Sequence, residues 1–129
     1  MKLLLDTCAF LWISGGVRPI PPRAAAAYRS PENEVFLSAA SAWEIAVKYA
    51  GGKLDLPLAP HALVPPERER MGVASLAIDE ESALHIARLP PLHCDPFDRM
   101  LVAQAIVHGM TIVTPDDAIT QYAVRTMWQ

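Results

Sequence analysis

Short apolar runs alternate with amphipathic stretches along this chain, which predicts strands that alternate with helices. The clearest strand is 2–6, where leucines follow one another as in a strand buried on both faces of a parallel sheet. We predict further strands at 34–38, 73–78, 110–114 and 124–128. The segments between them predict helices at 9–14, 23–30, 41–50, 79–88, 95–108 and 116–122. This alternation indicates an α/β fold with helices on both faces of a central, mostly parallel sheet.

The helix at 95–108 carries the strongest local signals. Asp95 can cap its first turn, Pro96 suits the first helical position, and Gly109 follows its last residue. Its apolar residues recur at helical spacing and predict a stripe that faces a core. These residues are Leu101, Val102, Ala105 and Ile106.

The helix at 41–50 and the segment that follows it have weaker signals. Ser41 and Glu44 have the spacing of a capping box, so the helix is predicted to begin at about Ser41. Its core-facing stripe is predicted at Ala42, Ile45, Ala46 and Tyr49. The segment 53–70 contains several prolines without a clear period, so we predict a loop there with at most a short helix.

Composition narrows the class of protein. A chain of 129 residues is predicted to form one domain, spanning 1–129, and 52% hydrophobic residues can build its core without disulfides. Cys8 and Cys94 are therefore interpreted as reduced, buried thiols of a cytoplasmic protein. No apolar run approaches the roughly 18–20 residues of a membrane span. The net charge of −3 argues against a strongly basic nucleic-acid clamp, but not against a nuclease whose acids hold cations.

Four carboxylates are predicted to meet at one edge of the sheet. Parallel strands share one carboxyl edge, and the helices that follow them begin there, which is where open α/β sheets bind ligands. Asp6 ends the first strand, and Asp116 directly follows the strand at 110–114. Glu44 and Asp98 are predicted in the first turns of two helices that begin at this edge.

Local structure alone could explain three of these acids. Glu44 fits a capping box, Asp98 complements a helix dipole, and Asp116 suits a helix cap, whereas Asp6 has no evident local role. Two carboxylates about 5 Å apart repel by roughly 3 kcal/mol at an effective dielectric of about 20. A divalent cation turns that repulsion into binding energy, and an all-carboxylate set of ligands suits Mg²⁺ or Mn²⁺ better than zinc. Such an ion supports hydrolysis of a phosphodiester.

Four segments of the chain also carry a resemblance to a known family. They read LLLDT at 3–7, SAASAWEIAVK at 38–48, HCDPFDRMLVAQA at 93–105 and TPD at 114–116. In this order they resemble the PIN domain and, more closely, the VapC toxins of bacterial toxin–antitoxin pairs. The resemblance implies a PIN-like α/β/α sandwich, and a Mg²⁺-dependent endoribonuclease that commonly forms a homodimer and is neutralised by a VapB-type antitoxin. It places the family's catalytic, metal-binding acids at Asp6, Glu44, Asp98 and Asp116.

The neighbours of these acids have both structural and functional interpretations. Thr7 orients Asp6 or a water on the metal, or else forms a plain turn at the end of the strand, and Thr114 has a similar choice. Asp95 serves as a helix cap in preference to an outer ligand of the metal. Arg99 is expected to form a surface ion pair, with Asp95 as its partner, or to bind a phosphate.

Other polar and aromatic residues give weaker signals. His93 and Cys94 suggest zinc, but no second ligand pair has metal spacing, so a zinc site is not expected. Lys48 is interpreted as a solvated helix end, with RNA phosphate as the alternative partner. Trp12 and Trp43 belong either to the core or to a groove where an antitoxin helix docks.

Three other functions are consistent with parts of this pattern. A phosphatase could use Asp6 as its nucleophile, but the common form of that chemistry needs a carboxylate two residues later, where this chain has Cys8. A PIN nuclease could serve housekeeping RNA processing instead of a toxin–antitoxin pair. A degenerate domain could bind RNA or a protein partner without catalysis, although the presence of all four acids argues against it.

Overall fold

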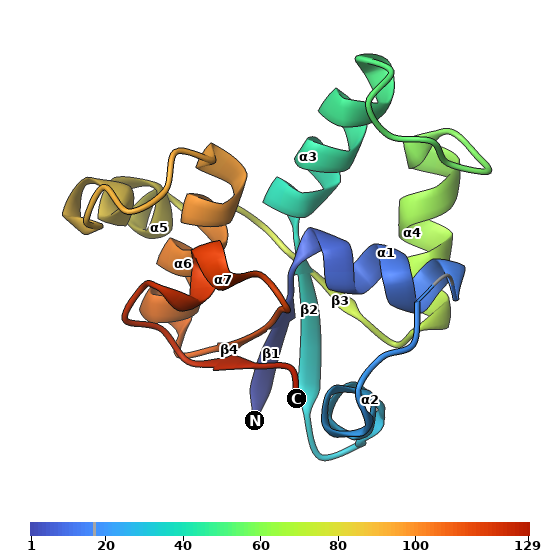
Figure 1. Ribbon diagram of the computed structural model, residues 1–129, viewed down its shortest axis with the longest axis horizontal. Coiled ribbons are helices and arrows are strands. Elements are labelled where there is room, and N and C mark those ends of the chain that lie inside the picture. Colours follow the sequence, from blue (N-terminus) through green and yellow to red (C-terminus); the bar gives the residue numbers. More distant parts are fainter. Residues whose placement is uncertain (17) are drawn as a thin grey trace.

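A five-stranded sheet forms the centre of the protein in the computed structural model, which describes residues 1–16 and 18–129 (Figure 1). The strand order is β3-β2-β1-β4-β5, and all four pairings are parallel. The strands are β1 (Lys2–Leu5), β2 (Glu34–Ser38), β3 (Ala74–Leu76), β4 (Thr111–Val113) and β5 (Thr126–Met127). The predicted α/β class with a parallel sheet is therefore confirmed.

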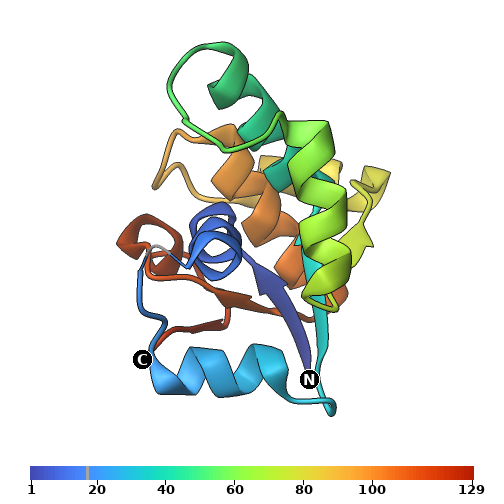
Figure 2. The ribbon, with the colours of Figure 1, turned by 90° about the vertical axis from the view of Figure 1, so that its right-hand side faces the viewer.

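Helices cover both faces of this sheet. They are α1 (Thr7–Gly15), α2 (Pro22–Arg29), α3 (Ala39–Ala50), α4 (Pro60–Arg70), α5 (Glu80–His85), the 3-10 helix η1 (Ile86–Arg88), α6 (Pro96–His108) and α7 (Asp117–Thr120). Figures 1 and 2 show α1, α2 and α4 on one side of β1 and β2, with α5, α6 and α7 on the other. Among the described residues, no helix combines the length and the apolar character needed to cross a membrane.

The leucines of β1 divide the core into two layers. Leu3 and Leu5 pack with Phe10 of α1 on one face, and Leu4 packs with Leu101 of α6 on the other. All three leucines are fully buried. Contiguous apolar residues at the start of the chain are therefore needed because alternate side chains point to opposite, equally buried faces.

Helix α3 begins earlier than predicted, and it buries a different face. Ser38 is its N-cap, and the Ser38 hydroxyl accepts the Ala40 N–H, so Ser41 and Glu44 form no capping box. The buried residues of α3 are Ala40, Ser41, Glu44 and Ile45, and those expected in the core but found exposed are Ala46 and Tyr49. The spacing of apolar residues predicted the wrong face for α3, because the charged residue Glu44 lies on the buried face.

The segment predicted as a loop contains an eleven-residue helix, α4. Pro60 starts this helix, but Pro65 and Pro66 lie inside it, where each removes a backbone hydrogen bond. Leu63 and Val64 are buried, and Val64 packs in the same core layer as Val35 and Leu37 of β2. We attribute the helix to this tertiary packing, because prolines alone would disfavour it.

Helix α6 begins and ends as predicted. The Asp95 carboxylate accepts the N–H groups of Phe97 and Asp98, and Gly109 closes the helix with φ +67°. The prediction that Ile106 belongs to the core-facing stripe was wrong, because its side chain is 38% exposed. Gln104 is fully buried instead.

Gln104 joins α6 to the end of β2. Its amide oxygen accepts the Ser38 hydroxyl at 2.5 Å, and its amide nitrogen donates to the carbonyl of Ala77 at 3.0 Å. We expect Gln104→Leu to lower the free energy of unfolding by about 1–3 kcal/mol, because the buried Ser38 hydroxyl loses its acceptor. Urea unfolding measures this change, with the exposed Gln121→Leu as control. Equal losses in both variants would contradict the assignment.

Candidate metal centre

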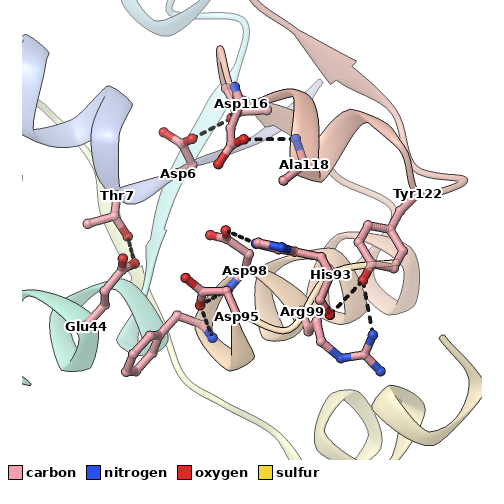
Figure 3. Close-up of polar contacts among 12 residues, drawn as sticks. Asp6, Thr7, Glu44, His93, Asp95, Asp98, Arg99, Asp116, Ala118 and Tyr122 are labelled. Atoms are coloured by element: carbon pink, nitrogen blue, oxygen red, sulfur yellow. Dashed lines mark hydrogen bonds and ion pairs between the residues drawn. The ribbon is translucent and has the colours of Figure 1, made fainter. Parts of the chain in front are cut away.

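Four helices begin at the carboxyl edge of the sheet, and they bring the predicted acids together. Asp6 follows β1 and caps α1, while Asp116 follows β4 and caps α7. Glu44 lies in the second turn of α3, and Asp98 lies in the first turn of α6. Figure 3 shows all four side chains around one space at this edge.

Asp6 is the most buried of these acids, at 3% exposure. One of its carboxylate oxygens accepts the Ala9 N–H at 2.6 Å, and the other accepts the hydroxyl of Thr114. The expectation that Asp6 has no local role was therefore wrong, because it caps α1. Burial nevertheless raises the pKa of Asp6 to about 7; the hydrogen bonds oppose this shift, and the charges of Asp98 and Asp116 add to it.

Asp98 also resists ionisation. Burial, together with the smaller effects of the charges of Asp95, Glu44 and Asp116, raises its pKa to about 6, although the hydrogen bond from His93 opposes this shift. His93 Nε2 lies 3.0 Å from Asp98 Oδ2. Two acids in one space, Asp6 buried and Asp98 partly buried, each with a raised pKa, indicate a surplus of negative charge that a cation would neutralise.

Glu44 is held in place from two sides. The hydroxyl of Thr7 donates to its Oε1 at 2.6 Å, and the Lys48 ammonium group pairs with its Oε2. This hydrogen bond to Glu44 raises the pKa of Lys48. Thr7 therefore positions Glu44, whereas Thr114 is the threonine that positions Asp6. Thr7 was expected to orient Asp6, but its partner is Glu44. Lys48, expected at a solvated helix end, pairs with Glu44 as well.

Asp116 combines a structural bond with access to the shared space. Its Oδ1 accepts the Ala118 N–H at 2.9 Å, which caps α7, and its own N–H donates to Thr114 Oγ1 at 3.0 Å. Asp117 is exposed. The charge of Asp116 adds to the pKa shifts of both Asp6 and Asp98, so it belongs to the same electrostatic cluster.

The tightest group of ligand atoms includes two residues, His93 and Asp95, that were not predicted as metal ligands. Within residues 1–16 and 18–129, the one group whose ligand atoms all lie within 4.8 Å of one another is His93, Asp95 and Asp98. Asp6, Glu44 and Asp116 stand further around the space, where their oxygens accept hydrogen bonds from neighbouring groups.

The chemistry of these side chains fits a hard divalent cation. Carboxylate oxygens are the ligands that Mg²⁺ and Mn²⁺ prefer. Cys94 is exposed and stands outside the tight group, so no thiolate joins it. The site therefore suits Mg²⁺ or Mn²⁺, and the roles of the four acids as ligands stay a prediction.

A family model of the PIN domain matches residues 3–125. The chain belongs to the PIN domain family. Ribonuclease VapC16 of Mycobacterium tuberculosis (strain ATCC 25618 / H37Rv) is 43% identical over 53 residues, which cover 41% of this PIN domain and 38% of that relative. The match thus spans less than half the length of that curated relative.

Solved structures share the fold across almost the whole chain. VapBC2 from Rickettsia felis, bound to a DNA fragment from their promoter, has a TM-score of 0.72 at 13% identity and covers 100% of both chains. DNA-bound VapBC from Salmonella typhimurium has a TM-score of 0.68 at 18% identity, with 98% of this chain and 97% of that chain covered. FitAcB from Neisseria gonorrhoeae has a TM-score of 0.60 at 23% identity, with 97% of this chain and 96% of that chain covered. These likenesses confirm the PIN-like sandwich.

Arg99 of this PIN domain does not make the ion pair that was expected with Asp95. Its guanidinium donates to the carbonyls of Pro90 at 3.0 Å and Ile86 at 3.2 Å, and to the hydroxyl of Tyr122 at 3.0 Å. These bonds fix Arg99 within the fold, and phosphate binding by Arg99 stays a prediction. The expected capping by Asp95 is confirmed.

The two tryptophans and the two cysteines singled out in the sequence are partly or largely exposed. Trp43 is 55% exposed and packs edge-to-face on Phe97 at 4.8 Å between ring centroids, so it is not a core residue. Trp12 lines an apolar cavity of about 270 Å³ together with residues of the 54–57 loop and α4. Cys8 and Cys94 are free and exposed, so the prediction that they are buried was wrong.

Proposed function

We propose that this PIN domain is a divalent-cation-dependent endoribonuclease that acts as the toxin of a type II toxin–antitoxin pair. One observation carries the proposal: four carboxylates from α1, α3, α6 and α7 face one space, and two of them are held above their ordinary pKa. A purely structural set of helix caps gives no reason for the buried Glu44 to face the same space. Mg²⁺ is the proposed cofactor, with Mn²⁺ as its substitute.

The chain's own groups divide the work between them. Asp6, Asp98 and Asp116 are proposed to supply oxygens to the cation. Glu44 accepts hydrogen bonds from Thr7 and Lys48, so its carboxylate is fixed for orienting the attacking water or for completing the set of ligands. When bound, Mg²⁺ lowers the pKa of a water and stabilises the charge that develops on the phosphodiester.

The biological assignment rests on relatives. The partial match to Ribonuclease VapC16 supports RNA as substrate, and similar folds occur in VapBC and FitAB assemblies, which supports a VapB-type antitoxin as partner. The apolar cavity beside Trp12 is a suitable place for an antitoxin helix, because Leu54, Leu56 and Leu63 line it. A homodimer remains a prediction.

Cleavage of single-stranded RNA tests the proposal. We expect the purified protein to cut RNA with Mg²⁺ or Mn²⁺, to lose activity in EDTA, and to recover it when the cation returns. Asp98→Asn is the matched variant, because it retains shape and removes one charge. Activity that persists undiminished in Asp98→Asn would refute the assignment, and calorimetry without Mg²⁺ or Mn²⁺ binding would favour a non-catalytic module.

A further inference from the structure

His93 reaches the proposed metal centre from the loop that precedes α6. It lies outside any helix or strand, and its Nε2 is 3.0 Å from Asp98 Oδ2. When Asp98 is ionised its carboxylate can only accept, and this assigns the hydrogen to His93 Nε2 as the donor. In Figure 3 the imidazole stands on one side of the Asp98 carboxylate, and the space shared with Asp6, Asp116 and Glu44 lies on the other.

The loop that carries His93 is tied down from two elements. Tyr122, which follows α7, donates its hydroxyl hydrogen to the His93 carbonyl at 3.5 Å, and that hydroxyl accepts from Arg99 of α6 at 3.0 Å. Arg99 also holds the carbonyls of Pro90 and Ile86, which precede His93 in the chain. The position of the imidazole therefore depends on the packing of α6 and α7, and not only on the loop.

Asp98 has no comparable support from its other neighbour. Asp95 comes close, but its Oδ1 accepts the backbone N–H groups of Phe97 and Asp98, and its charge repels the Asp98 carboxylate. His93 is thus the side chain that fixes how this carboxylate turns. A carboxylate free to rotate about its last bond loses conformational entropy when a cation binds it, and a fixed one does not.

We propose that His93 is a positioning residue for cation binding: its Nε2–H holds Asp98 Oδ2 so that Oδ1 faces the cation shared with Asp6 and Asp116. This inference rests on the cation of the proposed function. The rival role is direct ligation, because the ligand atoms of His93, Asp95 and Asp98 lie within 4.8 Å of one another. Ligation would require Nε2 to lose its hydrogen and exchange Asp98 for the ion, so the observed hydrogen bond favours positioning.

Three variants separate the two roles. His93→Gln places an amide N–H near the position of Nε2 and so preserves donation, whereas His93→Ala removes it. His61→Ala changes an exposed histidine of α4 and serves as control. Mn²⁺ affinity is measured by calorimetry on RNA-free protein at one pH, and Mg²⁺ affinity by competition, with thermal unfolding in EDTA to verify that each variant folds.

We expect His93→Ala to weaken Mn²⁺ binding about 10–100-fold, and His93→Gln to restore most of it. Electron spin-echo spectroscopy of Mn²⁺ on the native protein should show no coupling to an imidazole nitrogen. That spectrum tests the inference even if His93→Ala fails to fold. Nitrogen coupling, or a His93→Gln variant as weak as His93→Ala, would make His93 a ligand and overturn the proposal.

Failure of this inference is distinguishable from failure of the proposed function. If both His93 variants bind the cation as tightly as the native protein does, the positioning role is rejected and the nuclease proposal is left intact. Native protein that binds the cation but cleaves no RNA would reject the nuclease and leave the positioning role. Native protein that binds neither Mn²⁺ nor Mg²⁺ would overturn both.

Discussion

Replacing Asp6 with asparagine is expected to abolish cation-dependent RNA cleavage and, at the same time, to stabilise the cation-free protein. Activity should fall by about 100-fold or more, because a carboxylate proposed to hold the cation becomes a neutral amide. Stability should rise because the pKa of about 7 means that folding penalises the charged form of Asp6 at neutral and higher pH.

The size of this stabilisation follows from the shift. The pKa of Asp6 rises from 3.8 to about 7, so at pH 8 the charged side chain destabilises the fold by roughly 2–4 kcal/mol. Asparagine retains the cap on α1, because its amide oxygen can still accept the Ala9 N–H, and its amide nitrogen can donate to Thr114 Oγ1 in place of the hydrogen bond that Asp6 accepts from that hydroxyl. Thermal unfolding in EDTA at pH 8 should show the melting temperature raised by about 5–10 °C.

The exposed acid Asp55 provides the control for this experiment. Asp55→Asn removes the same charge outside the acid cluster, so it should leave both cleavage and melting temperature almost unchanged. An Asp6→Asn protein that melts lower than the native one in EDTA would contradict the electrostatic account. A variant that still cleaves RNA at the native rate would contradict the metal role of Asp6.

The second large effect is a dependence of stability on pH that a cation reverses. Asp6 and Asp98 have folded-state pKa values of about 7 and about 6, both above their ordinary 3.8. The folded state therefore holds more protons than the unfolded state across this window. Without a cation, stability should be greatest near pH 4–5 and should fall as the pH rises through about 7.

Adding Mg²⁺ or Mn²⁺ at pH 8 should restore much of the lost stability. The cation binds the ionised carboxylates of the folded state, and at 100 times its dissociation constant it adds about 2.7 kcal/mol. Thermal unfolding at several pH values, with EDTA and with millimolar cation, measures both effects. A monovalent salt at the same ionic strength, without any divalent cation, serves as the control for general screening of charges.

Asp6→Asn should flatten the pH profile of the cation-free protein, because it removes the larger of the two shifts. Asp79 acts in the opposite direction, since the hydrogen bond from His108 holds its pKa below the ordinary value. Its contribution is lost only as the pH falls below about 3.8, so it does not affect the window of interest. A cation-free protein that becomes more stable from pH 5 to pH 8 would contradict the account.

Local patterns in the sequence determined most of the fold and the choice of acids. Contiguous leucines in 2–6 specify a strand buried on both faces, and Asp95, Pro96 and Gly109 specify the ends of α6, because capping and φ preferences act over a few residues. Parallel strands then require Asp6 and Asp116 to share one edge. The convergence of these acids could therefore be predicted without coordinates, whereas their roles as ligands stay a prediction.

Tertiary structure decided what depends on distant contacts. It placed Glu44 on the buried face of α3, kept α4 helical despite Pro65 and Pro66, and buried Gln104 where periodicity favoured Ile106. It also brought His93 to Asp98 through a loop that Arg99 and Tyr122 hold. Such choices escape local patterns because burial, and the hydrogen bonds that make it tolerable for polar groups, are set by residues far away in the chain.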